Sequence, residues 1–312
     1  MHVFRDINQL PKLKNAVITI GTFDGVHLGH QKIIAQIKQE AAAIEGETII
    51  ITFYPHPRKV VHKEQKPLYL LNTLSEKLHL LEQYGVDNVI VVPFNEAFAS
   101  QSAAAYVEDF LVAKIHPKVI IIGYDHKFGK NRMGDYKTLE QYGQKCGFRV
   151  MEIPEKVLDE VTISSTRIRE AIRNGNIDQA NEYLGHPYSI SGSVVKGNQL
   201  GRTIGYPTAN IHIVDADKLL PANGVYAVRV KDQNDDLYQG MLNIGVRPTI
   251  DGKALTTEVH IFEFSKDIYG QHLELQLIAR LRNEQKFSGL EALKAQLNRD
   301  AAAAKLALQL SN

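Results

Sequence analysis

The stretch "GTFDGVHLGH", residues 21–30, directly follows the apolar run "AVITI" at residues 16–20. An apolar run that leads through a glycine-rich turn into an amphipathic stretch is typical of a strand–turn–helix unit. His27 and His30 stand three residues apart, so on a helix their side chains share one face. This junction predicts a buried strand, a tight turn, and a helix that begins near the two histidines.

The rest of the first half repeats this alternation of short apolar runs with longer stretches of helical spacing. Four further runs are typical of strands buried on both faces: "TIIITF" (48–53), "NVIVVPF" (88–94), "KVIIIG" (118–123) and "FRVMEI" (148–153). Strands that alternate with helices predict an α/β domain with a parallel sheet. In such sheets ligands bind beyond the carboxyl ends of the strands.

The pattern changes after residue 185. The second half has short, alternating runs rich in Val, Ile, Tyr and Thr, separated by turn signals, which predict an antiparallel barrel or sandwich. These runs are "YSISGSVVKG", "GVYAVRVKD", "YQGMLNIG", "TTEVHIFEF" and "HLELQLIARL". A last helical run extends over residues 288–310, with Ser288 as its predicted cap. We place the boundary near Leu184–Pro187 and predict two domains, 1–184 and 185–312.

The bulk composition excludes several classes of protein. The net charge of +1 provides no basic surface for nucleic acid or an anionic membrane. No apolar run approaches the roughly 20 residues of a membrane helix, and the first residues lack a signal-peptide core. The single cysteine, Cys146, has no partner for an internal disulfide. We expect a cytoplasmic globular protein that binds neither nucleic acid nor membrane; its oligomeric state is open.

The chemistry of the first motif favours an anion. Free backbone N–H groups at the start of a helix, together with the helix dipole, bind phosphate. Gly29 leaves room for a phosphate beside the helix, and both imidazoles can donate to phosphoryl oxygens. Two other interpretations stay open: a zinc site, for which two histidines are too few ligands, and a capped helix with incidental histidines.

A second glycine-rich stretch, "GNQLGRTIGYPTANI", spans residues 197–211. It is not a Walker A loop, because GxxxxGK[ST] does not occur in the chain. Thr208 and Asn210 provide two oxygens on one side of an extended segment, and hard oxygens of this kind suit Mg²⁺. The alternative is a β-turn with local hydrogen bonds.

The first half resembles the adenylyltransferase module of the prokaryotic bifunctional riboflavin kinase/FAD synthetase family. The resemblance begins in "GTFDGVHLGHQ", a version of the HxGH signature of nucleotidyltransferases, and covers essentially all of this half. It continues through "TFYPHPRKV" (52–60), "LNTLSEK" (71–77), "PFNEAFASQSAAAYVEDFLV" (93–112), "GYDHKFGKNRMGD" (123–135) and "ISSTRIR" (163–169). It implies a Rossmann-like nucleotidyltransferase domain.

The resemblance also implies residue roles, with His27 and His30 holding the phosphates of ATP in the transition state. The other nucleotide-binding residues that it implies are Gly21, Phe23, Asp24, Gly25, Gly29, Asp125, Ser164, Ser165, Thr166 and Arg167. Without the resemblance, the "SST" run would indicate only a helix N-cap. The resemblance assigns Phe53, His56 and Arg58 to the flavin side, although His56 could be an ordinary surface residue.

The first half departs from the family at one position. His126 stands where the family commonly has Phe. We expect changed flavin or adenine contacts there rather than lost activity.

The second half, about 185–312, resembles riboflavin kinase, which implies a six-stranded antiparallel barrel with a C-terminal helix. Glu258 matches the catalytic carboxylate of the family; the alternative is a solvent-facing strand residue. The implied ATP-binding residues are Gly201, Arg202, Gly205, Pro207, Thr208 and Asn210, of which Thr208 and Asn210 would bind Mg²⁺. Asn243, Arg247 and Arg282 fall in motif segments and are predicted on the flavin side, although Arg282 could form only a surface pair with Glu284.

Together the two resemblances imply flavin cofactor synthesis from riboflavin and ATP. The second domain would phosphorylate riboflavin to FMN, and the first would join AMP from a second ATP to FMN, giving FAD and pyrophosphate. Mg²⁺ would serve both steps. Three alternatives stay open: a kinase only, since His126 leaves room for a weakened adenylyltransferase; another HxGH transferase; and a flavin-binding regulatory module without turnover.

Overall fold

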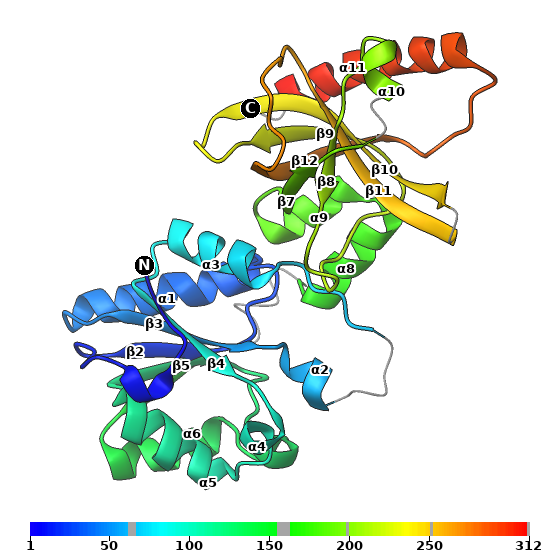
Figure 1. Ribbon diagram of the computed structural model, residues 1–312. Coiled ribbons are helices and arrows are strands. Elements are labelled where there is room, and N and C mark those ends of the chain that lie inside the picture. Colours follow the sequence, from blue (N-terminus) through cyan, green and yellow to red (C-terminus); the bar gives the residue numbers. More distant parts are fainter. Residues whose placement is uncertain (62–66, 155–162, 198–199, 250–251, 311–312) are drawn as a thin grey trace. The chain divides into compact units, whose positions relative to one another are not determined.

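The computed structural model describes residues 1–61, 67–154, 163–197, 200–249 and 252–310 (Figure 1). Contacts divide the chain into two compact units, Met1–Ser165 and Thr166–Asn312. Within the described ranges, no helix combines the length and the apolar character that crossing a membrane requires.

The first unit is built on a six-stranded sheet in the order β1-β4-β3-β2-β5-β6, and every neighbouring pair is parallel. Its strands are β1 (His2–Phe4), β2 (Val17–Ile20), β3 (Thr48–Tyr54), β4 (Asn88–Pro93), β5 (Val119–Gly123) and β6 (Arg149–Ile153). The predicted parallel sheet is confirmed. Sequence pattern missed only β1, because three residues are too few to show a period.

Helices cover both faces of this sheet (Figure 1). Ile49 and Ile51 of β3 pack into the core on one face and Ile50 into the core on the other, which explains the unbroken apolar runs. The first of these cores includes helical residues 106–115 and α6, and the second includes α1 and α3. The helices are η1 (Ile7–Gln9), α1 (Leu28–Ala43), α2 (Pro57–Val61), α3 (Leu74–Gln83), α4 (Glu96–Ala99), α5 (Ala103–Ala105), η2 (Tyr106–Ile115), η3 (Lys130–Arg132) and α6 (Tyr136–Cys146).

The strand order positions the first site. From β2 the chain builds outward through β3 and β4 on one side, and then returns to place β5 and β6 on the other side of β2. The direction of winding therefore reverses between β2 and β5. Parallel α/β sheets bind ligands beyond the carboxyl ends of the strands at such a point.

The second unit is a closed barrel in the order β10-β11-β8-β7-β12-β9, with antiparallel pairing throughout, and confirms the predicted six-stranded barrel. Its strands are β7 (Tyr188–Val195), β8 (Ala209–His212), β9 (Gly224–Lys231), β10 (Leu237–Thr249), β11 (Gly252–Ile261) and β12 (His272–Arg282). The short helix α10 (Leu200–Thr203) precedes β8. Helix α11 (Leu290–Leu310) packs on the barrel through Ala304 and Leu308.

Two helices stand between the sheet and the barrel in the sequence, α8 (Ser165–Asn174) and α9 (Ile177–Leu184). In α9, Asn181 donates from Nδ2 to the carbonyl of Leu277 at 2.9 Å and accepts from the backbone N–H of Tyr188 at 2.7 Å. These contacts place α9 with the barrel unit. The functional boundary after Leu184 stays a prediction from the sequence pattern.

Candidate active sites

The turn between β2 and α1 has an unusual backbone. Phe23, Gly25 and Val26 have φ angles of 48°, 93° and 40°, all in the left-handed region. Glycine enters this region freely, whereas a phenylalanine or a β-branched valine there costs about 1–3 kcal/mol. Surrounding contacts must therefore hold the turn in this conformation.

Asp24 provides several of these contacts. Its Oδ1 accepts hydrogen bonds from the backbone N–H groups of Leu71 at 2.9 Å and Asn72 at 3.3 Å. Its carbonyl oxygen accepts from Oγ of Ser165 at 3.0 Å. Two predicted nucleotide-binding residues, Asp24 and Ser165, therefore meet at the turn. Their contacts with ATP stay predictions.

The two histidines of the motif are stacked. The ring centroids of His27 and His30 lie 3.7 Å apart with 20° between the planes, and the ring of Phe23 lies 4.8 Å from that of His30. His27 is the residue before α1 and is buried. A Cβ at Gly29 would lie 3.2 Å from Nδ1 of His27, so the glycine leaves room for this ring.

The electrostatics of the pair favour a neutral imidazole. Burial, reinforced by His27 and by Lys77 of α3, holds the pKa of His30 well below its ordinary value. Burial also lowers the pKa of Lys77 to about 8, against the opposing effect of Asp24. At neutral pH His30 therefore presents one N–H donor and one acceptor nitrogen.

A cavity of about 630 Å³ opens at the carboxyl ends of the strands. Five predicted site residues line it: Gly21, Phe53, Arg58, Asp125 and His126. Its walls also include the aromatic rings of Phe94, Phe98, Tyr106 and Phe128, and the basic residues Lys127, Lys130 and Arg132. Aromatic walls with a few polar groups suit a flat ring ligand, and the basic residues suit an anion.

The remaining predicted residues of the first site lie apart from this lining. His56 precedes α2, and its Nδ1 accepts from the backbone N–H of Arg58 at 3.2 Å. The side chains of Ser164, Thr166 and Arg167 are exposed. Contacts assign Thr166 and Arg167 to the second unit, so their role beside the histidines stays a prediction.

The ring of His126 stacks on Phe128 with the ring centroids 6.1 Å apart. Its Nε2 is buried and makes no hydrogen bond within the described part of the chain. Burial, with Arg132 nearby and Asp125 opposing, lowers the pKa of His126 to about 4.

We expect His126→Phe to remove part of the acid sensitivity of the first unit. Below pH 6.5 the unfolded chain binds a proton at His126 that the folded chain takes up only near pH 4. The neutral His126 therefore contributes its full stabilisation above pH 6.5, and the free energy of unfolding decreases as the pH falls from 6.5 toward 4. Between pH 7 and pH 5 the loss amounts to about 2 kcal/mol. Urea unfolding at both pH values measures it; an equal loss in the variant would contradict this assignment.

In the second unit, polar side chains form a row across three strands. Glu258 of β11 lies directly opposite Asn243 of β10 and Asn210 of β8. Residues opposite one another in neighbouring strands share one face of a sheet. Glu258 is 8% exposed, so its carboxylate lies in a shielded environment between two amide side chains. The register thus brings together three predicted site residues.

The "PTAN" segment is held against β11. The ring of His260 donates from Nδ1 to the carbonyl of Pro207 at 2.7 Å. A Cβ at Gly197 would lie 2.0 Å from Nδ2 of Asn210, so a side chain at position 197 would displace this amide. The first residue of the glycine-rich stretch therefore lies directly beside the amide of Asn210 near the end of the same stretch.

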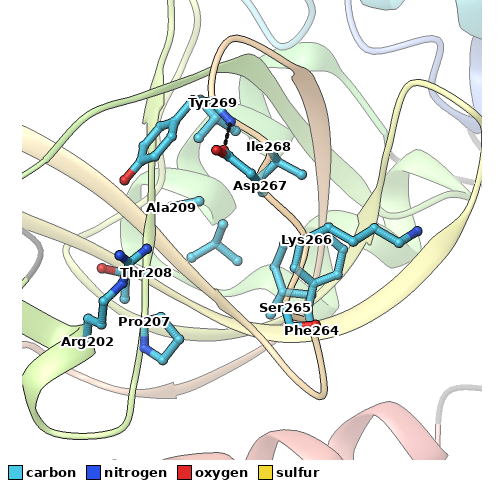
Figure 2. A pocket seen from close by; sticks show the side chains of 13 residues that line it. Arg202, Pro207, Thr208, Ala209, Phe264, Ser265, Lys266, Asp267, Ile268 and Tyr269 are labelled. Carbon is cyan, nitrogen blue, oxygen red and sulfur yellow. Dashed lines mark hydrogen bonds between the residues drawn. The ribbon is translucent and has the colours of Figure 1, made fainter.

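A second cavity, of about 620 Å³, takes in Arg202, Pro207 and Thr208 (Figure 2). In Figure 2 these three side chains lie on one side of the pocket and Phe264, Ser265 and Lys266 on the other. Ala209 and Val259 also line it. Because side chains alternate along a strand, their neighbours Asn210 and Glu258 point to the opposite face. This cavity is therefore lined by only part of the predicted kinase site, without Asn210 and Glu258. Gly205, with φ of 85°, forms an exposed turn nearby in the sequence.

Arg282 has a structural partner. Its guanidinium donates to the carboxylate of Asp300 in α11 from Nε at 2.9 Å and from Nη2 at 2.8 Å, while Nη1 donates to the carbonyl of Asn283. The structure pairs Arg282 with Asp300 rather than with Glu284. Its predicted flavin contact stays untested. The side chain of Arg247 lies outside the described residues.

Removal of this pair should destabilise the barrel unit. Asp300 is 3% exposed, and Asp300→Asn would leave the Arg282 charge shielded without its counter-ion. We expect a loss of about 2–4 kcal/mol in the free energy of unfolding, measured by urea denaturation. The control is Glu263→Gln, which breaks an exposed ion pair with Lys305, a residue of α11 like Asp300. This change should lower the free energy of unfolding by less than about 1 kcal/mol. Equal effects would contradict an anchoring role for Arg282.

The sequence motifs do not single out three residues that lie near the sites, Lys77, Tyr106 and His260. Lys77 occupies an apolar position of α3, one turn before buried Leu81, and this break in the helical pattern is a signal that could have revealed it. Tyr106 and His260 carry no such signal, since aromatic side chains at those positions fit ordinary packing. Among the described residues, no cluster of three or more His, Cys, Asp and Glu side chains is arranged to bind a metal.

Two family models match the chain in the order expected from its motifs. The FAD synthetase model matches residues 9–167, and the riboflavin kinase model matches residues 184–308.

Several curated proteins are similar over nearly their whole length. The chain is 41% identical to the bifunctional riboflavin kinase/FMN adenylyltransferase of Haemophilus influenzae, over 94% of each chain. It is 38% identical to the protein of that name from Escherichia coli K12, over 96% of this chain and 95% of the other. A solved structure described as a macrolide-efflux protein from Streptococcus pneumoniae is 31% identical, with a TM-score of 0.85 over 97% of this chain and 98% of the other.

Proposed function

The chain belongs to the family of bifunctional riboflavin kinases/FMN adenylyltransferases, and we propose that it catalyses both reactions. The barrel unit transfers the γ-phosphoryl group of ATP to the ribityl 5′-hydroxyl of riboflavin, which gives FMN. The parallel-sheet unit joins the AMP of a second ATP to the FMN phosphate, which gives FAD and releases pyrophosphate. ATP and riboflavin are the substrates, and FMN is both product and substrate.

For the kinase step, we assign Glu258 as the general base. A primary alcohol is a weak nucleophile, so a carboxylate must accept its proton as the oxygen attacks the γ-phosphorus. The shielded position of Glu258 between Asn210 and Asn243 supports this role, because both amides can hold the carboxylate and the hydroxyl in line. The glycine-rich stretch that contains Asn210 suits the ATP phosphates.

Thr208 and Asn210 fit a Mg²⁺ ion in their chemistry. A hydroxyl and an amide oxygen are hard ligands, and Mg²⁺ in phosphoryl-transfer sites takes one or two protein ligands and completes its shell with phosphates and water. When bound, such an ion neutralises charge on the phosphates. Thr208 lines the second cavity and Asn210 points to the opposite face, so to hold one ion together the two side chains would have to turn toward a common point.

For the adenylyl transfer, we assign His27 and His30 to the ATP phosphates. The FMN phosphate attacks the α-phosphorus and pyrophosphate leaves, so no covalent intermediate on the protein is needed. Catalysis then depends on positioning and on donors aimed at the charge that develops on phosphorus. The cavity with aromatic walls would hold the flavin, with Arg58 and Lys130 among the basic groups available to its phosphate.

One observation carries the adenylyltransferase proposal. The stacked pair of His27 and His30 lies at the start of α1, after the turn that follows β2, at the point where the winding of the sheet reverses. Gly21 and Thr22 of the same turn line the 630 Å³ cavity, whereas the histidines lie outside its lining, which supports a flavin in the cavity and the ATP phosphates beside it.

The direct test is one incubation of the purified protein with riboflavin, ATP and Mg²⁺, with FMN and FAD resolved over time by chromatography. We expect FMN first and FAD afterwards. Production of FMN alone would restrict the proposal to the barrel unit. If riboflavin stays unchanged, the kinase assignment fails, and flavin fluorescence titration without ATP would then test a binding module. Supplied FMN with ATP would test the adenylyltransferase separately.

The same chemistry supports a proposed setting. A chain with one cysteine needs no oxidising compartment for an internal disulfide, and both substrates, riboflavin and ATP, are small molecules. We propose that the protein acts in the cytoplasm on small molecules, without nucleic acid.

A further inference from the structure

We propose that Lys77 is a positioning residue of the adenylyltransferase site, where its ammonium holds the turn that precedes the two histidines. This inference rests on the proposed function of the first unit. Lys77 belongs to α3 and lies outside both glycine-rich stretches, 21–30 and 197–211. It acts on the site through the backbone of the turn.

The burial of Lys77 is the first reason for this assignment. Lys77 is 7% exposed and lies one helical turn before the fully buried Leu81. Lysine is almost never buried unless its charge is paired or hydrogen-bonded, because loss of its hydration is unfavourable. An apolar residue at this position would extend the buried stripe of α3. Packing alone therefore does not explain a lysine here, and its ammonium group must have hydrogen-bond partners.

Its contacts show what the ammonium does. Nζ of Lys77 donates to the carbonyl oxygen of Thr22 at 2.9 Å and to Oγ1 of Thr52 at 3.1 Å. Oγ1 of Thr52 itself donates to the same carbonyl at 3.2 Å. Two donors, one from α3 and one from β3, thus converge on Thr22, the residue from which the left-handed turn begins.

The segment that leads to Lys77 holds the other side of the same turn. The backbone N–H groups of Leu71 and Asn72 donate to the Asp24 carboxylate, and a capping box between Thr73 and Glu76 fixes where α3 starts. Residues 71–77 therefore grip the turn at the carbonyl of residue 22 and at the carboxylate of residue 24.

The conformation of the turn gives this grip its consequence. Phe23 and Val26 have positive φ angles that their side chains disfavour, and His27 follows immediately. A turn released at residue 22 can relax toward ordinary φ values, and that movement shifts the imidazoles. A displacement of about 1 Å of catalytic groups lowers a rate by about 100-fold.

Amide hydrogen exchange of the peptide 21–30 tests the grip without any reaction. We expect Lys77→Met to accelerate exchange there by at least about threefold, whereas Lys77→Arg, which keeps the donors and the charge, should not. The matched control is Lys38→Met, because Lys38 also donates to a backbone carbonyl, that of Tyr84 at 2.9 Å, but from an exposed position away from the turn. Equal exchange in Lys77→Met and Lys38→Met would overturn the proposal.

The kinetic arm uses supplied FMN and ATP. For Lys77→Met we expect kcat for FAD formation to fall by about 100-fold, with KM for FMN within about twofold, and for Lys77→Arg to recover most of the loss. Circular dichroism and the urea midpoint establish the folded fraction of each variant. A fall in kcat explained by unfolded protein, or a change in KM alone, would refute positioning. Absence of FAD formation in the unchanged protein would refute the proposed function. The hydrogen-exchange comparison would still test whether Lys77 holds the turn, because it does not depend on the reaction.

Discussion

His27→Ala is expected to lower the rate of FAD formation from supplied FMN by about 10³-fold and to leave FMN formation from riboflavin near its original value. The expected loss is this large because, in the proposed mechanism, the ring donates a hydrogen bond to charge that develops in the transition state within a water-poor site. His27 is buried against His30, with the ring centroids 3.7 Å apart, so alanine also removes the support of the second imidazole. Chromatographic rates of the two reactions, measured separately, give both numbers.

The control for this change is His79→Ala. His79 is an exposed histidine of the same unit, hydrogen-bonded only to Gln83 within the described part of the chain. It should leave both rates unchanged. If His27→Ala lowers FMN formation as strongly as FAD formation, the assignment of one reaction to each unit is wrong.

Glu258→Gln should produce the opposite pattern. The amide has nearly the shape of the carboxylate but cannot accept a proton from the ribityl hydroxyl. We expect riboflavin phosphorylation to fall by about 10²–10⁴-fold, as for loss of a general base, while adenylylation of supplied FMN persists. The row that places Glu258 between Asn210 and Asn243 can remain in register, because glutamine keeps hydrogen-bonding groups toward both amides.

A matched change at Glu263 separates the base from general loss of charge. Glu263 lies in the turn after β11, is exposed, and pairs only with Lys305 in the described structure. Glu263→Gln should retain the full kinase rate. Riboflavin phosphorylation at the original rate in Glu258→Gln would exclude Glu258 as the base.

Much of the fold follows from local pattern. The apolar runs at 16–20, 48–53, 88–94 and 118–123 became β2, β3, β4 and β5 with shifts of at most one residue at their ends. A strand in a parallel sheet is covered by helices on both faces, so its residues form an unbroken apolar run. Short apolar runs between helical stretches therefore indicate parallel strands. Short elements were harder: β1 has three residues and β8 has four, too few for a periodicity to show.

The candidate sites divide in the same way. Sequence alone predicted that His27 and His30 begin a helix and share one face, since a spacing of three residues decides this locally. It also singled out Glu258 and Asn210, but it could not place them opposite one another, because strand register depends on the whole sheet. The ion pair of Arg282 with Asp300 was not predicted, because the two residues meet only through packing of α11 on the barrel; the flavin contact of Arg282 stays a prediction.

By itself, then, the sequence determined the number and class of the domains, the order of the two chemistries along the chain, and the two glycine-rich stretches where phosphates are expected. These are properties of residues close together in the chain. Only the tertiary structure decided which groups hold those stretches in place, since Asp24 meets Leu71 across 47 residues and Lys77 meets Thr22 across 55. Contacts of this kind leave no period in the sequence, because packing and strand order, rather than local spacing, bring the partners together.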